Sequence, residues 1–110
     1  MDILNRGFLT VRPKQAFLDW ANQIDKEVFF DESDSIESNT YLIEDDFFEI
    51  EPVIEKHFKK IFKHELSVIT EDEELWPETR TQEIFHAWFQ IEFGSIVVDL
   101  EKTDLISEKI

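Results

Sequence analysis

Residues 50–69 read IEPVIEKHFKKIFKHELSVI, and the apolar side chains in this run recur with the spacing of one face of an α-helix. That face holds Ile50, Val53, Ile54, Phe58, Ile61 and Phe62. The opposite face carries lysines at positions 56, 59, 60 and 63. Pro52 suits the first helical turn, where its missing N–H would have no partner in the helix. The pattern predicts an amphipathic helix from about Glu51 to Ile69 that packs on a sheet.

Short runs on either side of this helix are typical of strands. Phe8 to Arg12 and Thr40 to Ile43 predict two strands, and the Val- and Ile-rich run from Ile91 to Glu101 predicts the last. Gly94 inside the last run indicates a bulge or a close backbone contact. For Val28 to Phe30 the sequence leaves a short strand and a loop both open. The sheet is therefore expected to have three or four strands.

Two further helices are predicted, one on each side of the chain's central helix. The first follows Pro13 and runs to about residue 24, with an apolar stripe made by Ala16, Phe17, Trp20, Ala21 and Ile24. Pro77 is expected, like Pro13 and Pro52, to stand where a helical pattern begins. Thr79-Arg80-Thr81-Gln82 matches a capping box, in which Thr and Gln side chains satisfy free N–H groups at a helix start. The helix that follows is expected to bury Ile84, Phe85 and Trp88.

The order of these elements predicts an α+β fold. A small sheet of three or four strands is expected, with the helices on one face, and it resembles a ferredoxin-like split β-α-β sandwich with an added helix. The length of 110 residues is typical of one domain, so residues 1–110 are expected to form a single domain. Residues 102–110 show no pattern and are expected to be an irregular tail.

The charge balance excludes several kinds of partner. The chain has 26 Asp and Glu against 11 Lys and Arg, a formal net charge of −15. Such a surface repels phosphate, so we expect no direct binding to nucleic acid and no docking on anionic membranes. It favours partners with basic surfaces. The first residues show no signal peptide and no apolar run is long enough to span a membrane, so a cytoplasmic protein is expected.

The sequence predicts no metal site and no cofactor. There is no cysteine, and no glycine-rich phosphate loop or HExxH motif occurs. His57 and His64 share a helix face, but seven residues rise about 10 Å, whereas two ligands of one zinc ion lie within about 4 Å of each other. The acidic run from Asp31 fails the EF-hand pattern, because Ile36 and Leu42 stand where Gly and Glu are needed. No catalytic residues are assigned.

Glu65 is an unusual residue, because its helical angle places it among the apolar residues of the central helix. A buried carboxylate has to be paired or hydrogen-bonded, or else its pKa rises. Three explanations stay open: a pair with Arg80 or another cation, a perturbed acid in a functional site, or a helix that frays before residue 65.

Aromatic residues stand inside two acidic runs and are candidates for a partner-binding surface. Phe47 and Phe48 follow Asp45 and Asp46, and Trp76 follows the acidic run 71–74. Aromatic anchors rimmed by charge are typical of protein interfaces. The alternative is that these rings belong to the core while the acids solvate the loops.

Several short motifs, in order, resemble an uncharacterised family of short acidic bacterial proteins. They are Arg12-Pro13-Lys14, Phe17 to Trp20, Tyr41-Leu42-Ile43, Leu75-Trp76-Pro77, Arg80-Thr81, Phe85-x-x-Trp88-Phe89-x-Ile91-Glu92 and Val98-Asp99-Leu100. The resemblance implies a bacterial cytosolic origin and no assigned activity. It also singles out Arg12, Trp76, Arg80 and Glu92 beside the core motifs.

Three functions are compatible with these observations. The leading hypothesis is a non-enzymatic protein-interaction or regulatory protein whose partner has a basic surface. The second is a small hydrolase-like or isomerase-like enzyme with a pocket that uses Glu65 or Glu92 with Arg80. The third is a DNA mimic that occupies a nucleic-acid-binding protein. The sequence leaves the oligomeric state open.

Overall fold

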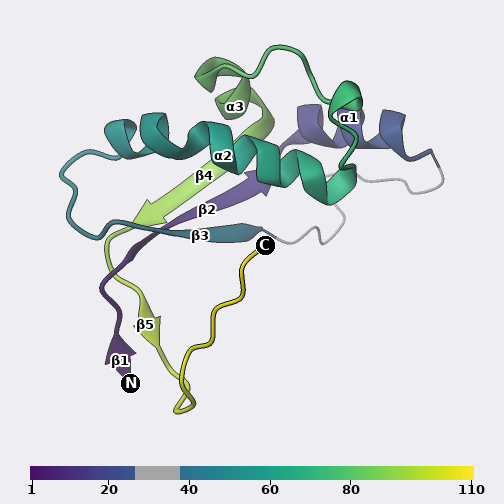
Figure 1. Cartoon of the computed structure of the whole chain (residues 1–110). Coiled ribbons are helices and arrows are strands. Elements are labelled where there is room, and N and C mark those ends of the chain that lie inside the picture. Colours follow the sequence, from purple (N-terminus) through teal and green to yellow (C-terminus); the bar gives the residue numbers. More distant parts are fainter. Residues whose placement is uncertain (27–37) are drawn as a thin grey trace.

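Three helices lie on one face of a three-stranded sheet in the computed structural model, which describes residues 1–26 and 38–110 (Figure 1). Strand β2 (Gly7–Pro13) is central, with β3 (Asn39–Ile43) on one side and β4 (Phe89–Gly94) on the other. Side chains alternate along β2, so Leu9 and Val11 point to the helices and are fully buried. The predicted α+β class, with helices on one face of a small sheet, is confirmed.

The strand directions differ from those of the split β-α-β arrangement that the element order resembles. That arrangement places two parallel strands side by side, whereas β2 is antiparallel to both β3 and β4. Periodicity predicts where the elements lie but not the directions in which strands pair, so it could not distinguish the two arrangements. The open question about Val28 to Phe30, and most of the predicted loop from Asp31 to Asn39, lie outside the described residues.

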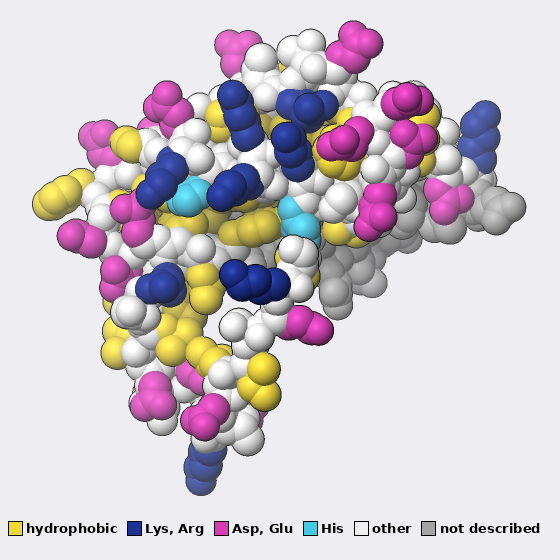
Figure 2. Space-filling model, in the orientation of Figure 1, with side chains coloured by type: hydrophobic (Ala, Val, Ile, Leu, Met, Phe, Trp, Pro, Cys, Tyr) yellow, Lys and Arg dark blue, Asp and Glu magenta, His cyan; other side chains and the backbone are white. Residues whose placement is uncertain are grey.

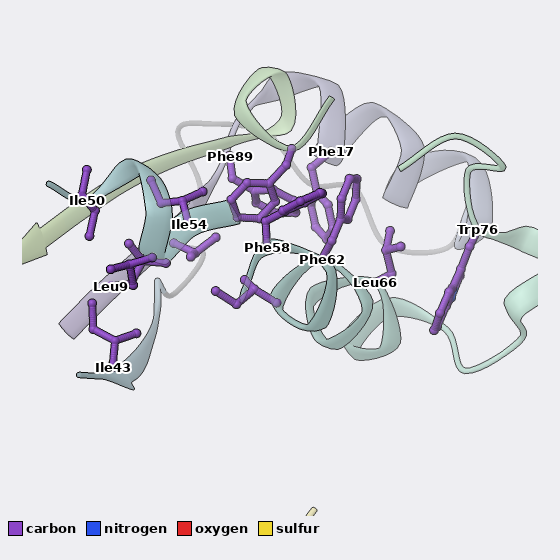
Figure 3. Packing of buried hydrophobic residues seen from close by; sticks show 14 of the residues in the cluster. Leu9, Phe17, Ile43, Ile50, Ile54, Phe58, Phe62, Leu66, Trp76 and Phe89 are labelled. Atoms are coloured by element: carbon purple, nitrogen blue, oxygen red, sulfur yellow. The ribbon is translucent and has the colours of Figure 1, made fainter. Parts of the chain in front are cut away.

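Helix α2 (Glu51–Ile69) has the bounds that its apolar period predicts, and its stripe forms the centre of the core (Figure 3). Phe62 is 0% exposed. Its ring lies 5.8 Å from Phe85, 5.7 Å from Trp88 and 5.5 Å from Phe89, centroid to centroid. Offset and tilted ring pairs of this kind add to the stabilisation from apolar burial. The predicted core face of α2 is therefore confirmed.

The starts of two helices differ from the prediction. Helix α1 (Gln15–Ile24) begins two residues after Pro13, which is still in β2, and Pro77 stands outside any helix. Helix α3 (Gln82–Trp88) is capped by Thr81 and not by Thr79, because the Thr81 hydroxyl accepts a hydrogen bond from the N–H of Ile84 at 3.2 Å. Thr81 is the extended residue directly before the helix, so its side chain is the one that reaches the free N–H.

The predicted last strand is two strands in the structure. β4 ends at Gly94, and β5 (Val98–Asp99) leaves the sheet to pair with β1 (Asp2–Ile3). The β2–β4 register runs unbroken to the pair Phe8↔Gly94, where a Cβ on the glycine would lie 2.6 Å from the Phe8 ring. Of the two expectations for Gly94, the structure therefore has the close contact, both with the Phe8 ring and with the backbone at Gly7, where an added Cβ would lie 2.7 Å from the Gly94 carbonyl oxygen.

The β1–β5 ribbon projects from the main body (Figure 1). The radius of gyration is 15.4 Å, whereas a compact chain of this length is expected to have about 13 Å. Residues 100–110 form no helix or strand and lead back towards β3. Among the described residues, no helix combines the length and the apolar character that crossing a membrane requires.

Replacing Phe62 by alanine tests the role of the α2 stripe. Phe62→Ala removes a fully buried ring and leaves a cavity, so the free energy of unfolding is expected to fall by about 3–5 kcal/mol. Val68→Ala on the same helix is the matched control, because Val68 is 63% exposed, and a change within about 0.5 kcal/mol is expected there. Urea unfolding followed by circular dichroism measures the free energy of unfolding of both variants. An equally small loss in the two variants would contradict the packing of Phe62 in the core.

Candidate functional site

Residues 44–50, between β3 and α2, surround a cavity of about 530 Å³. We call this region the acidic loop surface and define it by Glu44, Asp46, Phe47, Phe48, Glu49 and Lys56. Pro52 and Val53 from the first turn of α2 complete the lining. Asp45 is also exposed, next to Asp46. Four of the five predicted partner-binding residues, 45–48, therefore lie in one place.

Phe47 and Phe48 have opposite environments although they are neighbours in the chain. Phe47 is half-buried, and its ring lies 6.4 Å from that of Phe93. It also lies close to Gly7, where an added Cβ would be 3.3 Å from the Phe47 ring. Phe48 is fully exposed. Phe47 thus anchors the loop on the sheet, and Phe48 points away from the protein.

The charges of the acidic loop surface are solvated. Lys56 Nζ lies 3.9 Å from Glu44 Oε1, and both side chains are exposed. A pair of this kind contributes at most about 1 kcal/mol. Asp45, Asp46 and Glu49 are exposed as well. The region therefore presents a single large ring among carboxylates that water can reach.

Trp76, the fifth predicted partner-binding residue, belongs to the core. It follows the short 3₁₀ helix η1 (Glu73–Leu75), and its side chain is 8% exposed. Its indole N–H donates to the carbonyl of Thr70 at 2.8 Å. The guanidinium of Arg80 lies 5.7 Å from the Trp76 ring centroid and donates to the carbonyl of Pro77. Trp76 is thus not available as a surface anchor.

The two acidic runs lie near opposite ends of α2. The helix separates them by about 27 Å, given its 19 residues and a rise of about 1.5 Å per residue. Glu78 and Arg80 border a different cavity, of about 320 Å³, together with Lys59 and Lys63. Lysines therefore stand between the two runs, and the runs do not form one patch.

The four residues of the predicted pocket lie in three separate places. Arg12 and Glu92 are opposite Gln90 and Thr10 in the β2–β4 ladder, and they point to the sheet face that the helices leave open. Arg80 lies against Trp76. Glu65 is in α2, on the covered side of the sheet.

Glu65 is buried, with 3% exposure, and hydrogen bonds satisfy its carboxylate. Its Oε2 accepts from Asn39 Nδ2 at 2.7 Å and from the Tyr41 hydroxyl at 2.5 Å. α2 continues to Ile69, so the expectation of a frayed helix end is wrong. The basic side chain beside Glu65 is that of His64, whose Nδ1 lies 3.9 Å from Oε2, and not that of Arg80.

Tyr41 connects Glu65 to His64. Its hydroxyl donates to Glu65, and the same oxygen lies 2.7 Å from His64 Nδ1. A hydroxyl has one hydrogen, so the bond to the histidine requires an N–H at Nδ1. We call Asn39, Tyr41, His64 and Glu65 the Glu65 cluster. Sequence reasoning missed Tyr41 and Asn39: Tyr41 lies in a predicted strand, whereas Asn39 ends the predicted loop before it and is the first residue of β3.

Comparisons of this chain with models of protein families, with curated proteins and with solved structures found no match. The resemblance to a family of short acidic bacterial proteins stays a prediction. What the protein does is therefore inferred from its own side chains.

Alkaline titration tests the environment of Tyr41, the one tyrosine in the sequence. Burial, the hydrogen bond to Glu65 and the negative charge of that carboxylate raise the pKa of Tyr41 far above its ordinary value of 10.0. Below pH 10 the phenol is protonated in both folded and unfolded chains. Above pH 10 only the unfolded chain releases the proton, so stability falls as the pH rises.

Tyrosinate absorbance is expected to appear in the same pH step in which circular dichroism reports unfolding. The protein in urea is the control, because its tyrosine should titrate at about pH 10. Reversible titration near pH 10 in a protein that is still folded would show that Tyr41 is not held in this way.

Tyr41→Phe tests the hydrogen bonds of the same hydroxyl. The variant leaves the buried Glu65 with one donor fewer, so a loss of about 1–3 kcal/mol in the free energy of unfolding is expected. Thr40→Val is the matched control, because the Thr40 hydroxyl hydrogen-bonds that of Thr10 at 3.0 Å at an exposed position. This substitution should lower the free energy of unfolding much less than Tyr41→Phe does. Urea unfolding measures both losses, and if they are equal the cluster contributes no more than a surface contact.

Proposed function

We propose that this chain is a protein-interaction module whose acidic loop surface binds a partner segment that carries basic residues and an apolar side chain. The observation that supports this most directly is Phe48, a large ring that is fully exposed among carboxylates. A phenylalanine gains about 1.5–3 kcal/mol when it is moved from water into an apolar contact.

The position of Phe48 is set by its neighbours. Phe47 packs against Phe93 on one side, and Ile50 is buried in the core on the other. The loop between these two anchors is short, so few conformations are available to the ring. A partner that covers Phe48 would therefore lose little binding free energy to ordering of the loop.

The charge around Phe48 favours a basic partner. Asp45, Asp46 and Glu49 surround the ring, and the whole chain carries a net charge of −15. Charge of this kind speeds the encounter with an oppositely charged partner, whereas buried apolar contact lengthens the life of the complex. The two properties together are those expected of an interface with an aromatic anchor and a charged rim.

The arrangement of the other candidate residues weighs against the two alternative functions. Glu65, Glu92 and Arg80 lie in separate places, which gives no support to a pocket enzyme that uses them together. Lysines of α2 lie between the two acidic runs. A DNA mimic needs a continuous row of carboxylates, and these lysines disfavour such a row.

Selection from a library of displayed random peptides tests the proposal without a known partner. Enriched peptides are expected to contain Lys or Arg together with an apolar residue, and Phe48→Ala should weaken their binding about tenfold, which corresponds to about 1.4 kcal/mol. Leu75→Ala is the control, because Leu75 is also an exposed apolar residue but lies in η1. Peptides that bind Phe48→Ala as well as the parent protein would place the site elsewhere.

The carboxylates are tested through binding kinetics with an enriched basic peptide. Replacing Asp45 and Asp46 by Asn should slow association and flatten its dependence on salt, with little effect on dissociation. Phe48→Ala should speed dissociation and leave association nearly unchanged. Association and dissociation rates are measured at two salt concentrations. If both variants keep the rates of the parent protein, the acidic loop surface is not the binding site.

A further inference from the structure

A second cavity, of about 250 Å³, lies between α2 and β3. We call it the α2–β3 groove. The strand supplies Tyr41, Leu42 and Ile43, and the helix supplies His57, Lys60 and His64. None of these residues belongs to the acidic loop surface, so the groove is a separate feature of the molecule.

The groove runs along the free edge of β3. Side chains of a strand point alternately to its two faces, so Tyr41 and Ile43 face the helices while Leu42, between them, faces the other side. A cavity bordered by all three therefore follows the edge of the strand and not one face. β3 is an outer strand of the sheet, and in the described part of the chain only β2 pairs with it. Its outer N–H and C=O groups can therefore pair with another strand.

The two walls of the groove differ in chemistry. Leu42 and Ile43 from the strand and Ile61 from the helix are aliphatic, and Leu42 is exposed. The helix adds Lys60 and two histidines at the rim. Figure 2 shows this face, with histidine surface in cyan beside hydrophobic surface in yellow and with Lys and Arg in dark blue over α2. In a chain with a net charge of −15, this face favours an acidic ligand.

The Glu65 cluster fixes the orientation of one rim residue. His64 donates from Nδ1 to the Tyr41 hydroxyl, which is held by the buried Glu65. Among the described residues, Nε2 of His64 has no hydrogen-bond partner in the protein. The ring is therefore held by one nitrogen, and the other is left to meet a ligand.

The length of the groove matches a short extended peptide. His57 and His64 are seven residues apart on α2, which is about 10 Å along the helix axis. About three residues of extended chain span the same distance. Ile110, from the irregular tail, also borders the groove, yet its side chain is fully exposed and leaves the groove unfilled. An aliphatic residue on an extended segment can thus approach this place.

We infer that the α2–β3 groove binds an extended acidic peptide segment, which adds as a strand to the free edge of β3. An aliphatic side chain of the peptide lies on Leu42 and Ile61, and its carboxylates face Lys60 and the protonated forms of His57 and His64, in which both ring nitrogens donate. Backbone pairing with an edge strand gives affinity in this mode of recognition, while the side-chain pockets give specificity. The inference goes beyond the proposed function and does not depend on Phe48.

Fluorescence polarisation with two labelled peptides tests the charge preference. The acidic probe is acetyl-EVEIEVE-amide, and the control probe acetyl-QVQIQVQ-amide has the same apolar residues without charge, so it lacks the basic residues that the acidic loop surface is proposed to bind. The full-length chain is expected to bind the acidic probe at least about tenfold more tightly. Equal binding of both probes, or no binding of the acidic one, would overturn the inference.

Two neighbouring lysines provide a matched pair of variants. Lys60 borders the groove, whereas Lys59 borders the separate cavity with Arg80, and both are exposed. Lys60→Glu should weaken binding of the acidic probe about tenfold, Lys60→Gln should weaken it less, and Lys59→Glu should leave it within about twofold. If Lys59→Glu and Lys60→Glu are equally harmful, the attraction is diffuse and the groove is not the site.

Methylation of backbone nitrogens tests the pairing with β3. Only every second N–H of an added strand faces its neighbour, so methylating one alternate set of probe amides should abolish binding and methylating the other set should not. Equal effects of the two sets would exclude strand addition. Octanoate is the small-molecule comparison. If octanoate binds and the acidic peptide does not, the groove takes a small carboxylate, and the inference is overturned.

The Phe48→Ala variant separates this inference from the proposed function. It should bind the acidic probe as the parent does, while its binding to basic peptides is about tenfold weaker. Loss of acidic-probe binding in Phe48→Ala would place that probe on the acidic loop surface and overturn the inference, whatever the outcome for basic peptides.

Discussion

A three-stranded sheet with helices on one side has to bury that side against an apolar surface of similar width, and α2 supplies most of it. Phe62 stands at the centre of this contact, with Phe85, Trp88 and Phe89 around it. Because the apolar stripe of α2 is used in the core, its lysines have to face solvent. The lysines and histidines of this helix therefore form a basic surface on a chain whose net charge is −15. The α2–β3 groove derives its basic rim from this packing arrangement.

The sequence predicted the elements whose signals are local and strong. The 3.6-residue period of α2 and the alternation around Leu9 and Val11 gave the bounds of that helix and the buried face of β2, because burial selects both patterns directly. The strand directions could not be predicted in this way, since they depend on contacts between distant segments. The break after Gly94 was missed because Val98 and Asp99 keep the composition of a strand although they pair elsewhere.

The candidate surfaces were only partly predictable for a related reason. Composition marks Phe47, Phe48 and Trp76 as aromatic residues near acids, but composition does not show which ring finds a partner in the core. Phe47 has Phe93 and the close approach to Gly7, and Trp76 has Thr70 and Arg80. Phe48 has no such neighbour. The helical angle identified Glu65 as unusual, yet its donors come from β3, which is distant in the sequence.

The Glu65 cluster bears on why a carboxylate lies in this core. A leucine at position 65 would continue the apolar stripe of α2 without the cost of removing a charged group from water. Glu65 instead needs donors from Asn39 and Tyr41, and through Tyr41 it holds His64 at the rim of the α2–β3 groove. The same hydrogen bonds connect α2 to β3, the outer strand, and so fix the two walls of the groove relative to each other. A residue that served the core alone would do neither, which is the physical reason to connect this buried acid with binding at the edge of the sheet.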